Sequence, residues 1–245
     1  RIAALRGHKV TLFEKKAKLG GQIRLGIKSP YKREEENMIK FLEHQIRKLG
    51  VEVELNREVT PETVRERRPD VVIVATGATP LIPKIKGIER ENVVTAWNLL
   101  ADKEPRGKNA VVIGGGLVGC DVADFLVDKG NNVTIVEMLD DIAIEMEPWS
   151  KIYFFERIVK NRIKVITGAT VDEVTEKGVV ISDKTHERKL LESDIIVLAA
   201  GAIANRNLTN SLKGIASELY VIGDARKPRK AIDAIREGSH IAREI

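Results

Sequence analysis

The chain contains little cysteine and little histidine. Cys120 is the only cysteine among the 245 residues. One thiol excludes an intramolecular disulfide, a CxxC redox pair and an iron–sulfur cluster held by cysteines of this chain. The four histidines, His8, His44, His186 and His240, lie far apart, and none has another histidine or a cysteine at i+3 or i+4. We therefore predict no metal site.

Aromatic residues and long apolar runs are also scarce. The chain has five Phe and three Tyr, and although its formal charge is +5, the basic residues alternate with acids throughout. Both features disfavour nucleic-acid binding. No apolar run approaches the roughly 18 residues that a membrane span needs, and the first residues lack the apolar region of a signal peptide. We therefore expect a cytoplasmic protein that binds neither nucleic acid nor membrane.

A glycine-rich stretch in the middle of the chain carries the strongest functional signal. The sequence VVIGGGLVGCDVADFL predicts a buried strand, a tight turn and the start of a helix, with Gly114, Gly116 and Gly119 in a G-x-G-x-x-G pattern. Such a turn lets the backbone approach a pyrophosphate and points helix N-terminal amides at it. Glu137 ends the next predicted strand, close to the offset of roughly 20 residues at which an acid accepts ribose hydroxyls. We therefore predict a dinucleotide site; the alternative is a nucleotide-free α/β turn.

Residues beside this pattern refine the prediction. The Glu137 carboxylate would repel the 2′-phosphate of NADPH, and the residues after it, MLDD, supply no Arg or Lys to offset the repulsion. NADH is therefore the predicted nucleotide. Cys120 follows the third glycine, where a small residue lets helix and strand pack, so we interpret it as a buried structural thiol rather than a nucleophile.

The start of the chain resembles the second half of a similar unit. IAALRG predicts the end of a helix capped by Gly7, and KVTLFE predicts a short strand that ends in Glu14. Glu14 holds the position equivalent to Glu137, which suggests a second adenosine ribose; a solvated acid at a strand end is the alternative. A short helix end and a lone strand are not stable by themselves, so we expect an upstream strand and glycine loop that this chain lacks.

Two stretches of the chain repeat one plan. PDVVIVATGATP and SDIIVLAAGAIANR each predict a buried strand followed by a turn of small residues. Between them, the segment 163–191 predicts a meander of short strands. The expected fold is α/β, with two nested Rossmann-like, three-layer dinucleotide-binding domains. The first domain comprises residues 1–80 and 205–245, and the second, residues 81–204, is inserted into it.

Several motifs together resemble one enzyme class. FEKKAKLGGQ, VIVATGATP, VVIGGGLVGC, VTIVEM and YVIGDARKPRKAIDAIREG look like the two-dinucleotide-domain reductases of the pyridine nucleotide-disulfide oxidoreductase class. More narrowly, they are similar to the C-terminal half of old yellow enzyme-like NADH:flavin oxidoreductases, the group of 2,4-dienoyl-CoA reductase, enoate reductase and trimethylamine dehydrogenase. The resemblance spans nearly the whole chain.

The resemblance implies cofactors and site residues. Glu14 would hold the ribose of FAD, and the backbone of Val59 would contact its adenine. Gln22 and Lys32 would approach the flavin nucleotide. The turns and the Gly-Asp motif would complete the two cofactor sites through Ala75, Thr76, Gly77, Ala200, Gly201, Gly223 and Asp224. We name no catalytic acid or base, because hydride transfer between cofactors needs little proton transfer by the protein.

The resemblance also implies an upstream partner. Members of the family carry a TIM barrel with FMN and a 4Fe-4S cluster before this region, and neither is present here. The leading hypothesis is therefore a module that passes a hydride from NADH to FAD, with electrons travelling through the absent barrel to an alkene or enoyl-type substrate. Two alternatives stay open: a stand-alone NADH-dependent reductase of a ferredoxin or another redox protein, and an adenine-nucleotide-binding module without redox turnover.

Overall fold

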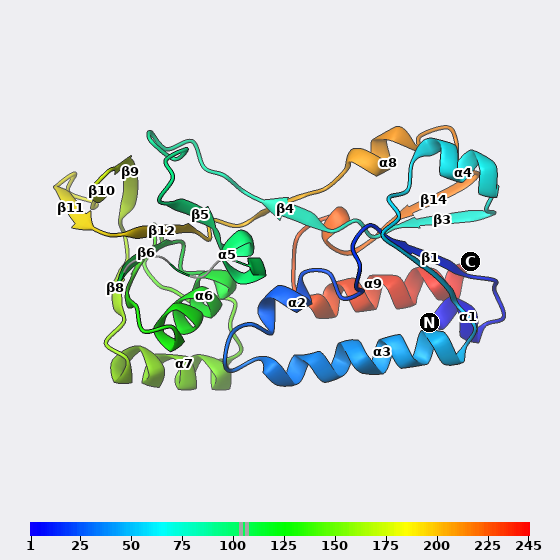
Figure 1. The fold of residues 1–245 in the computed structure, drawn as a ribbon, viewed down its shortest axis with the longest axis horizontal. Helices are drawn as coiled ribbons and strands as arrows, with labels where there is room; N and C mark the ends of the chain where they lie inside the picture. The colour runs from blue at the N-terminus through cyan, green and yellow to red at the C-terminus, as the bar shows by residue number, and fades with distance from the viewer. Residues whose placement is uncertain (103–104, 106–107) are drawn as a thin grey trace. The chain divides into compact units, whose positions relative to one another are not determined.

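The computed structural model describes residues 1–102, 105 and 108–245 (Figure 1). They divide into two compact units. Unit 1 comprises Arg1–Arg24, Glu34–Thr79 and Ala202–Ile245, and unit 2 comprises Leu25–Arg33 and Pro80–Gly201. Residues 25–33 thus group with unit 2, although the sequence analysis placed them in the first domain. The nucleotide-binding role of each unit stays a prediction.

Unit 2 is built on a parallel sheet of five strands in the order β5-β12-β6-β7-β8. An antiparallel sheet, β11-β10-β9, accompanies it. The elements of this unit after the 25–33 segment are β5 (Val93–Thr95), α5 (Ala96–Asp102), β6 (Asn109–Ile113), α6 (Leu117–Asp128), β7 (Asn132–Val136), α7 (Pro148–Lys160), β8 (Lys164–Ile166), β9 (Thr170–Thr175), β10 (Gly178–Ser182), β11 (Arg188–Glu192) and β12 (Ile195–Leu198).

The alternation of side chains along these strands separates two hydrophobic cores. On β6, Ala110 and Val112 pack with the helices α5, α6 and α7, whereas Val111 and Ile113 pack with residues of the antiparallel sheet. Successive side chains of a strand point to opposite faces, so one buried parallel strand serves both cores. The result is a layer of helices, a parallel sheet and a layer of antiparallel strands, which confirms the expected three-layer architecture for this unit.

The predicted meander needs one correction. The sequence analysis placed the whole segment 163–191 in it, but β8 pairs in parallel with β7 and extends the main sheet. Only β9, β10 and β11 form the antiparallel sheet. A three-residue strand such as Lys164–Ile166 carries too short a pattern to distinguish an edge strand of one sheet from the first strand of another.

Unit 1 contains shorter strand pairs. β1 pairs with β2 and β14 pairs with β3, both in parallel, and β13 pairs with β4. The elements within unit 1 are α1 (Ile2–Leu5), β1 (Thr11–Glu14), α3 (Glu36–Lys48), β2 (Glu52–Leu55), α4 (Pro61–Arg67), β3 (Val71–Val74), β13 (Ala202–Ala204), α8 (Asn207–Ser211), β14 (Glu218–Val221), the 3-10 turn η2 (Gly223–Ala225) and α9 (Ala231–Glu244). Three elements straddle the boundaries between the units: α2 (Ile23–Gly26), the 3-10 turn η1 (Arg33–Glu35) and β4 (Ala78–Pro80).

Local sequence explains where the helices of unit 1 begin and end. Gly7 follows α1 with a φ of 92°, in the left-handed region that favours glycine after a helix. Thr60 caps α4 by accepting a hydrogen bond from the Thr63 amide at 3.4 Å, and Pro61 occupies the first helical position. None of the helices in the described ranges is both long and apolar enough to cross a bilayer.

Cys120 lies on the buried face of α6. The side chain is 1% exposed, and its thiol donates to the Gly115 carbonyl at 3.5 Å. Burial, together with the nearby Asp121 and Asp124 carboxylates, raises the pKa of the Cys120 thiol to about 12. The structure thus confirms the prediction of a buried structural thiol.

The adjacent residues Phe154 and Phe155 offer a test of the unit 2 core. Phe154 is fully buried, whereas Phe155 is 37% exposed. Phe154→Ala should lower the free energy of unfolding by about 3–5 kcal/mol, because it removes a ring from a packed core and leaves a cavity. Phe155→Ala, the matched control, should cost about 1 kcal/mol. Urea titration followed by tryptophan fluorescence reports unit 2 alone, since Trp97 and Trp149 both belong to it. Equal losses in the two variants would contradict the packing.

The thiol of Cys120 provides a second test. At pH 8 the folded protein should react with a disulfide reagent only as fast as it opens, because the thiol is both buried and protonated. Protein unfolded in urea should react at once and serves as the control. Rapid and complete modification of the folded chain would show that Cys120 is accessible.

Candidate functional site

Packing restricts three glycines at the junction of β6 and α6, two in the turn and one in the first turn of α6. A Cβ on Gly119 would lie 1.9 Å from the Gly114 carbonyl oxygen, and a Cβ on Gly114 would lie 2.5 Å from the Ala199 carbonyl oxygen. A Cβ on Gly115 would lie 2.3 Å from Cγ2 of Ile142. Real Cβ atoms do not tolerate such distances, so Gly114 and Gly119, which face backbone atoms, accept only glycine, and a side chain at Gly115 would require Ile142 to move.

Gly116 has a different environment. It is the N-cap of α6, and a Cβ there would meet no atom of the described chain within 4 Å. The first amides of a helix have no partner inside the helix and carry the positive end of its dipole. The open space at Gly116 therefore lies where a phosphate can approach these amides. The turn fits a dinucleotide pyrophosphate.

Glu137 braces the same turn. Its side chain is 9% exposed. One carboxylate oxygen accepts the Gly115 amide at 2.6 Å, and the other accepts the Leu139 amide at 2.8 Å. A carboxylate has about four lone-pair positions, so both oxygens can still accept ribose hydroxyls. The structure thus brings Glu137 to the glycine turn, as the spacing in the sequence suggests.

The turn after β12 lies beside the glycine turn. The Ala199 amide donates to the Ile113 carbonyl at 2.8 Å, at the point where β6 ends. Ala200 and Gly201 follow, and Gly201 has a φ of 110°. The predicted residues Ala200 and Gly201 therefore share one edge of the parallel sheet with the glycine turn, where nucleotides bind in open α/β sheets.

In unit 1, four predicted residues from three distant parts of the sequence converge. Gln22 donates from Nε2 to Asp224 Oδ2 at 3.2 Å. A Cβ on Gly77, whose φ is 70°, would lie 3.5 Å from the same Gln22 nitrogen. Gly223 has a φ of 58°, and its amide donates to Glu237 at 2.7 Å. These residues form one polar cluster, which fits the hydroxyl-rich part of a flavin nucleotide.

The turn after β3 is fastened to the strand pair β4-β13. Thr76 donates from its hydroxyl to the Asn205 carbonyl at 3.0 Å, and the Asn205 amide donates to the Gly77 carbonyl at 3.0 Å. These bonds fix the predicted residues Ala75, Thr76 and Gly77 beside Gln22.

Glu14 ends β1 next to the β2–α4 turn. One oxygen of its carboxylate accepts the Lys16 amide at 2.8 Å, and the Arg57 amide donates to the Glu14 carbonyl at 3.0 Å. Val59, the residue predicted at the adenine, is half-buried in the same turn and packs in the cluster of Val64 and Val74. Glu14 and Val59 therefore belong to adjoining backbone segments of unit 1.

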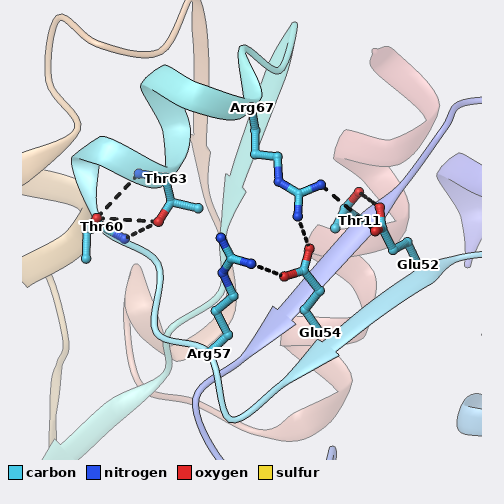
Figure 2. A network of polar contacts seen from close by, with 7 residues as sticks. All are labelled: Thr11, Glu52, Glu54, Arg57, Thr60, Thr63 and Arg67. Carbon is cyan, nitrogen blue, oxygen red and sulfur yellow. Dashed lines mark hydrogen bonds and ion pairs between the residues drawn. The ribbon is translucent and has the colours of Figure 1, made fainter.

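A polar network stabilises this region (Figure 2). Arg57 and Arg67 both bind the Glu54 carboxylate of β2, with an Arg57–Glu54 distance of 2.6 Å. Both guanidinium groups also lie over the Phe13 ring of β1, at 5.7 and 5.8 Å from its centroid. Thr11 donates to Glu52 across the strand pair at 2.8 Å. These contacts fix the strand that ends in Glu14.

Lys32 forms an ion pair within unit 2. It belongs to the 25–33 segment of unit 2, and its ammonium binds Asp121 of α6 at 2.8 Å. The sequence analysis interpreted Lys32 as a flavin ligand on the resemblance alone. Its described contact is with α6, the helix that follows the glycine turn.

A buried ion pair that the sequence analysis missed lies nearby. Asp124 of α6 is 3% exposed and accepts two guanidinium nitrogens of Arg157, the shorter contact measuring 2.7 Å. The same guanidinium stacks on Tyr31 at 4.0 Å from the ring centroid. The only available sequence signal was an acid at an apolar position of α6, which does not identify its partner.

Two further features of the described residues concern metal binding and an apolar groove. Within residues 1–102, 105 and 108–245, no three His, Cys, Asp or Glu side chains converge as a metal ion would require. A shallow apolar groove of about 860 Å³ runs along the outer face of α7, lined by residues such as Ile152, Phe155 and Val159. No predicted cofactor residue lines it, so it is not part of either site.

Comparisons with known proteins agree with this geometry. The pyridine nucleotide-disulphide oxidoreductase family model matches residues 2–238. An NADH oxidase of Thermoanaerobacter brockii is 42% identical over 99% of this chain, and a bilirubin reductase of Mediterraneibacter gnavus is 33% identical over the whole chain. The structure of a 2-naphthoyl-CoA reductase, 33% identical, superposes over 99% of this chain with a TM-score of 0.95.

The chain spans less than two fifths of each of these proteins: 38% of both the oxidase and the bilirubin reductase, and 37% of the naphthoyl-CoA reductase chain. The match nevertheless covers nearly every residue here, including the glycine turn, Glu137 and the Gly-Asp motif. The chain therefore belongs to the pyridine nucleotide-disulphide oxidoreductase family.

Proposed function

We propose that this chain is the NADH- and FAD-binding module of a larger flavin reductase. The observation that carries the proposal is the glycine turn between β6 and α6 of unit 2. Gly116 leaves open space at the α6 N-terminus, and the Glu137 carboxylate accepts a hydrogen bond from the turn. A pyrophosphate and an adenosine ribose are the ligand groups that suit these two features.

The polar cluster of unit 1 supports FAD as the second ligand. Asp224 can accept hydrogen bonds from ribityl hydroxyls, and Gln22 is held beside it by their mutual contact. Glu14 is placed to accept ribose hydroxyls through the carboxylate oxygen that does not accept the Lys16 amide. When bound, FAD supplies hydride acceptance from NADH and transfer of electrons onward. The residues of this chain bind and orient the two nucleotides.

The electron acceptor belongs to the rest of the enzyme. The relatives are an NADH oxidase, a bilirubin reductase and a 2-naphthoyl-CoA reductase, so the names differ in the acceptor while this region is shared. We propose that electrons leave through an upstream barrel with FMN and a 4Fe-4S cluster to an alkene or enoyl-type compound. A second candidate function is that this module reduces a separate redox protein. The differences in acceptor among the relatives support this candidate as well.

Glu137 provides a test of the nucleotide site. Glu137→Gln should weaken NADH binding about tenfold, because it removes a charged acceptor from the ribose and leaves one backbone amide of the turn poorly paired. ADP-ribose should lose affinity by a similar factor, since the contact lies at the adenosine end. Titration calorimetry measures both.

The matched control is Glu145→Gln, which changes the same charge at an exposed position of unit 2. It should leave both affinities within twofold of the wild type. Unchanged NADH binding in Glu137→Gln, with the same circular dichroism as wild type, would argue against a ribose contact at Glu137.

The proposed activity is tested spectroscopically. The complete product of the gene should purify with bound FAD, and anaerobic NADH should bleach the visible flavin absorption. Addition of an artificial electron acceptor should restore the colour, which distinguishes redox turnover from nucleotide binding alone. A colourless protein whose added FAD is not reduced by NADH would refute the proposal.

A further inference from the structure

A lysine from the antiparallel sheet of unit 2 reaches the segment that follows Glu137. Lys184, in the turn between β10 and β11, forms an ion pair with the Asp140 carboxylate. Asp140 is the third residue after Glu137. The local sequence MLDD contains no basic residue, so the fold supplies a cation that the linear sequence lacks here.

Backbone contacts place this pair beside the ribose acid. The Gly168 amide donates to the Leu139 carbonyl at 2.8 Å, and the Ala169 amide donates to the Glu137 carbonyl at 3.1 Å. A Cβ on Gly168 would lie 3.1 Å from Cε of Lys184 and 3.4 Å from Oδ1 of Asp140. Gly168 and Ala169, which precede β9, thus hold the backbone of residues 137–139 and the Lys184–Asp140 pair in one small region.

We propose that Asp140 and Lys184 form a selectivity pair that disfavours NADPH. The proposal rests on the proposed function, in which Glu137 binds the adenosine ribose. The 2′-phosphate of NADPH is attached to that ribose, so it would enter the region around Glu137 and Asp140. A lysine is a suitable phosphate ligand, but Lys184 is already neutralised by Asp140.

The charges of this region give the direction of the effect. Glu137 and Asp140 are negative, Lys184 is positive, and Asp141 is balanced by Lys151 at 2.7 Å. The sum is therefore negative, which repels a 2′-phosphate more than the ribose hydroxyl of NADH. Removing the Asp140 charge leaves the Lys184 ammonium without this carboxylate partner, so that it can bind the phosphate directly.

Both side chains can be changed without disturbing the fold. Lys184 is 66% exposed and Asp140 is 78% exposed, so neither contributes to a core. An exposed ion pair contributes little to stability. Variants at these positions therefore report on ligand binding rather than on folding.

The experiment measures NADH and NADPH affinities of the full chain by titration calorimetry at low ionic strength. Asp140→Asn should tighten NADPH binding about fivefold, the effect of one exposed charge contact, and change NADH binding less than twofold. Raising the salt concentration should reduce the gain, because exposed charges are screened.

Two further variants identify Lys184 as the ligand. Lys184→Gln alone should leave NADH binding unchanged, and Asp140→Asn with Lys184→Gln should lose the NADPH gain. Asp141→Asn is the matched charge control, because Lys151 remains over the Phe155 ring at 5.7 Å from its centroid. It should not tighten NADPH binding as Asp140→Asn does.

Three outcomes would overturn the assignment: no NADPH gain in Asp140→Asn, a gain that persists without Lys184, or an equal gain in Asp141→Asn. Each is informative only if the wild type binds NADH, which the same titration shows. A wild-type protein that does not bind NADH would instead refute the proposed function. The two failures are therefore distinguishable.

Discussion

The structure of unit 2 depends on the close approach of α6 to β6 and β12. That approach exists because Gly114 and Gly119 have no side chain: a Cβ at either position would lie within 2.5 Å of a carbonyl oxygen. Gly116, in the same pattern, has open space instead. The G-x-G-x-x-G pattern therefore contains two kinds of glycine. Some permit packing, and one leaves room for a ligand.

The two units place similar turns in different surroundings. Gly77 and Gly201 both adopt positive φ in the turn after a parallel strand, at 70° and 110°. In unit 2 the turn lies beside a glycine loop, whereas in unit 1 it lies beside the Gln22–Asp224 contact. The ion pairs of Arg57 and Arg67 with Glu54 then fix the strand that carries Glu14. Side-chain contacts thus position the turn in unit 1, whereas close backbone packing positions the corresponding turn in unit 2.

The sequence predicted those features that arise within a short stretch of chain. The strand, turn and helix around Gly114, the capped helix after Thr60 and the acid at Glu137 all follow from local patterns, and the structure contains each of them. The helix α5 and the edge strand β5 were not predicted, because Val93–Thr95 is too short to show a period.

Contacts between distant side chains were beyond prediction. Lys32 was assigned to the flavin by resemblance, and its described partner is Asp121, 89 residues away. Lys184 lies 44 residues from Asp140, and Arg157 lies 33 residues from Asp124. Such pairs depend on which strands and helices become neighbours, and a single sequence contains no signal for that. The absence of basic residues after Glu137 therefore described the local sequence correctly, but not the charges of the folded region.

The buried pair Asp124–Arg157 has a consequence for the anion site. Burying two charges costs more than an exposed pair, so such a pair is weak evidence for stability. Asp121 and Asp124, however, lie on the helix whose N-terminus faces the predicted pyrophosphate, and uncompensated carboxylates there would oppose an anion. Lys32 and Arg157 neutralise both, and all four groups are close enough to affect the Cys120 thiol. The positive end of the α6 dipole is therefore not opposed by uncompensated carboxylates, even though the second turn of the helix is acidic.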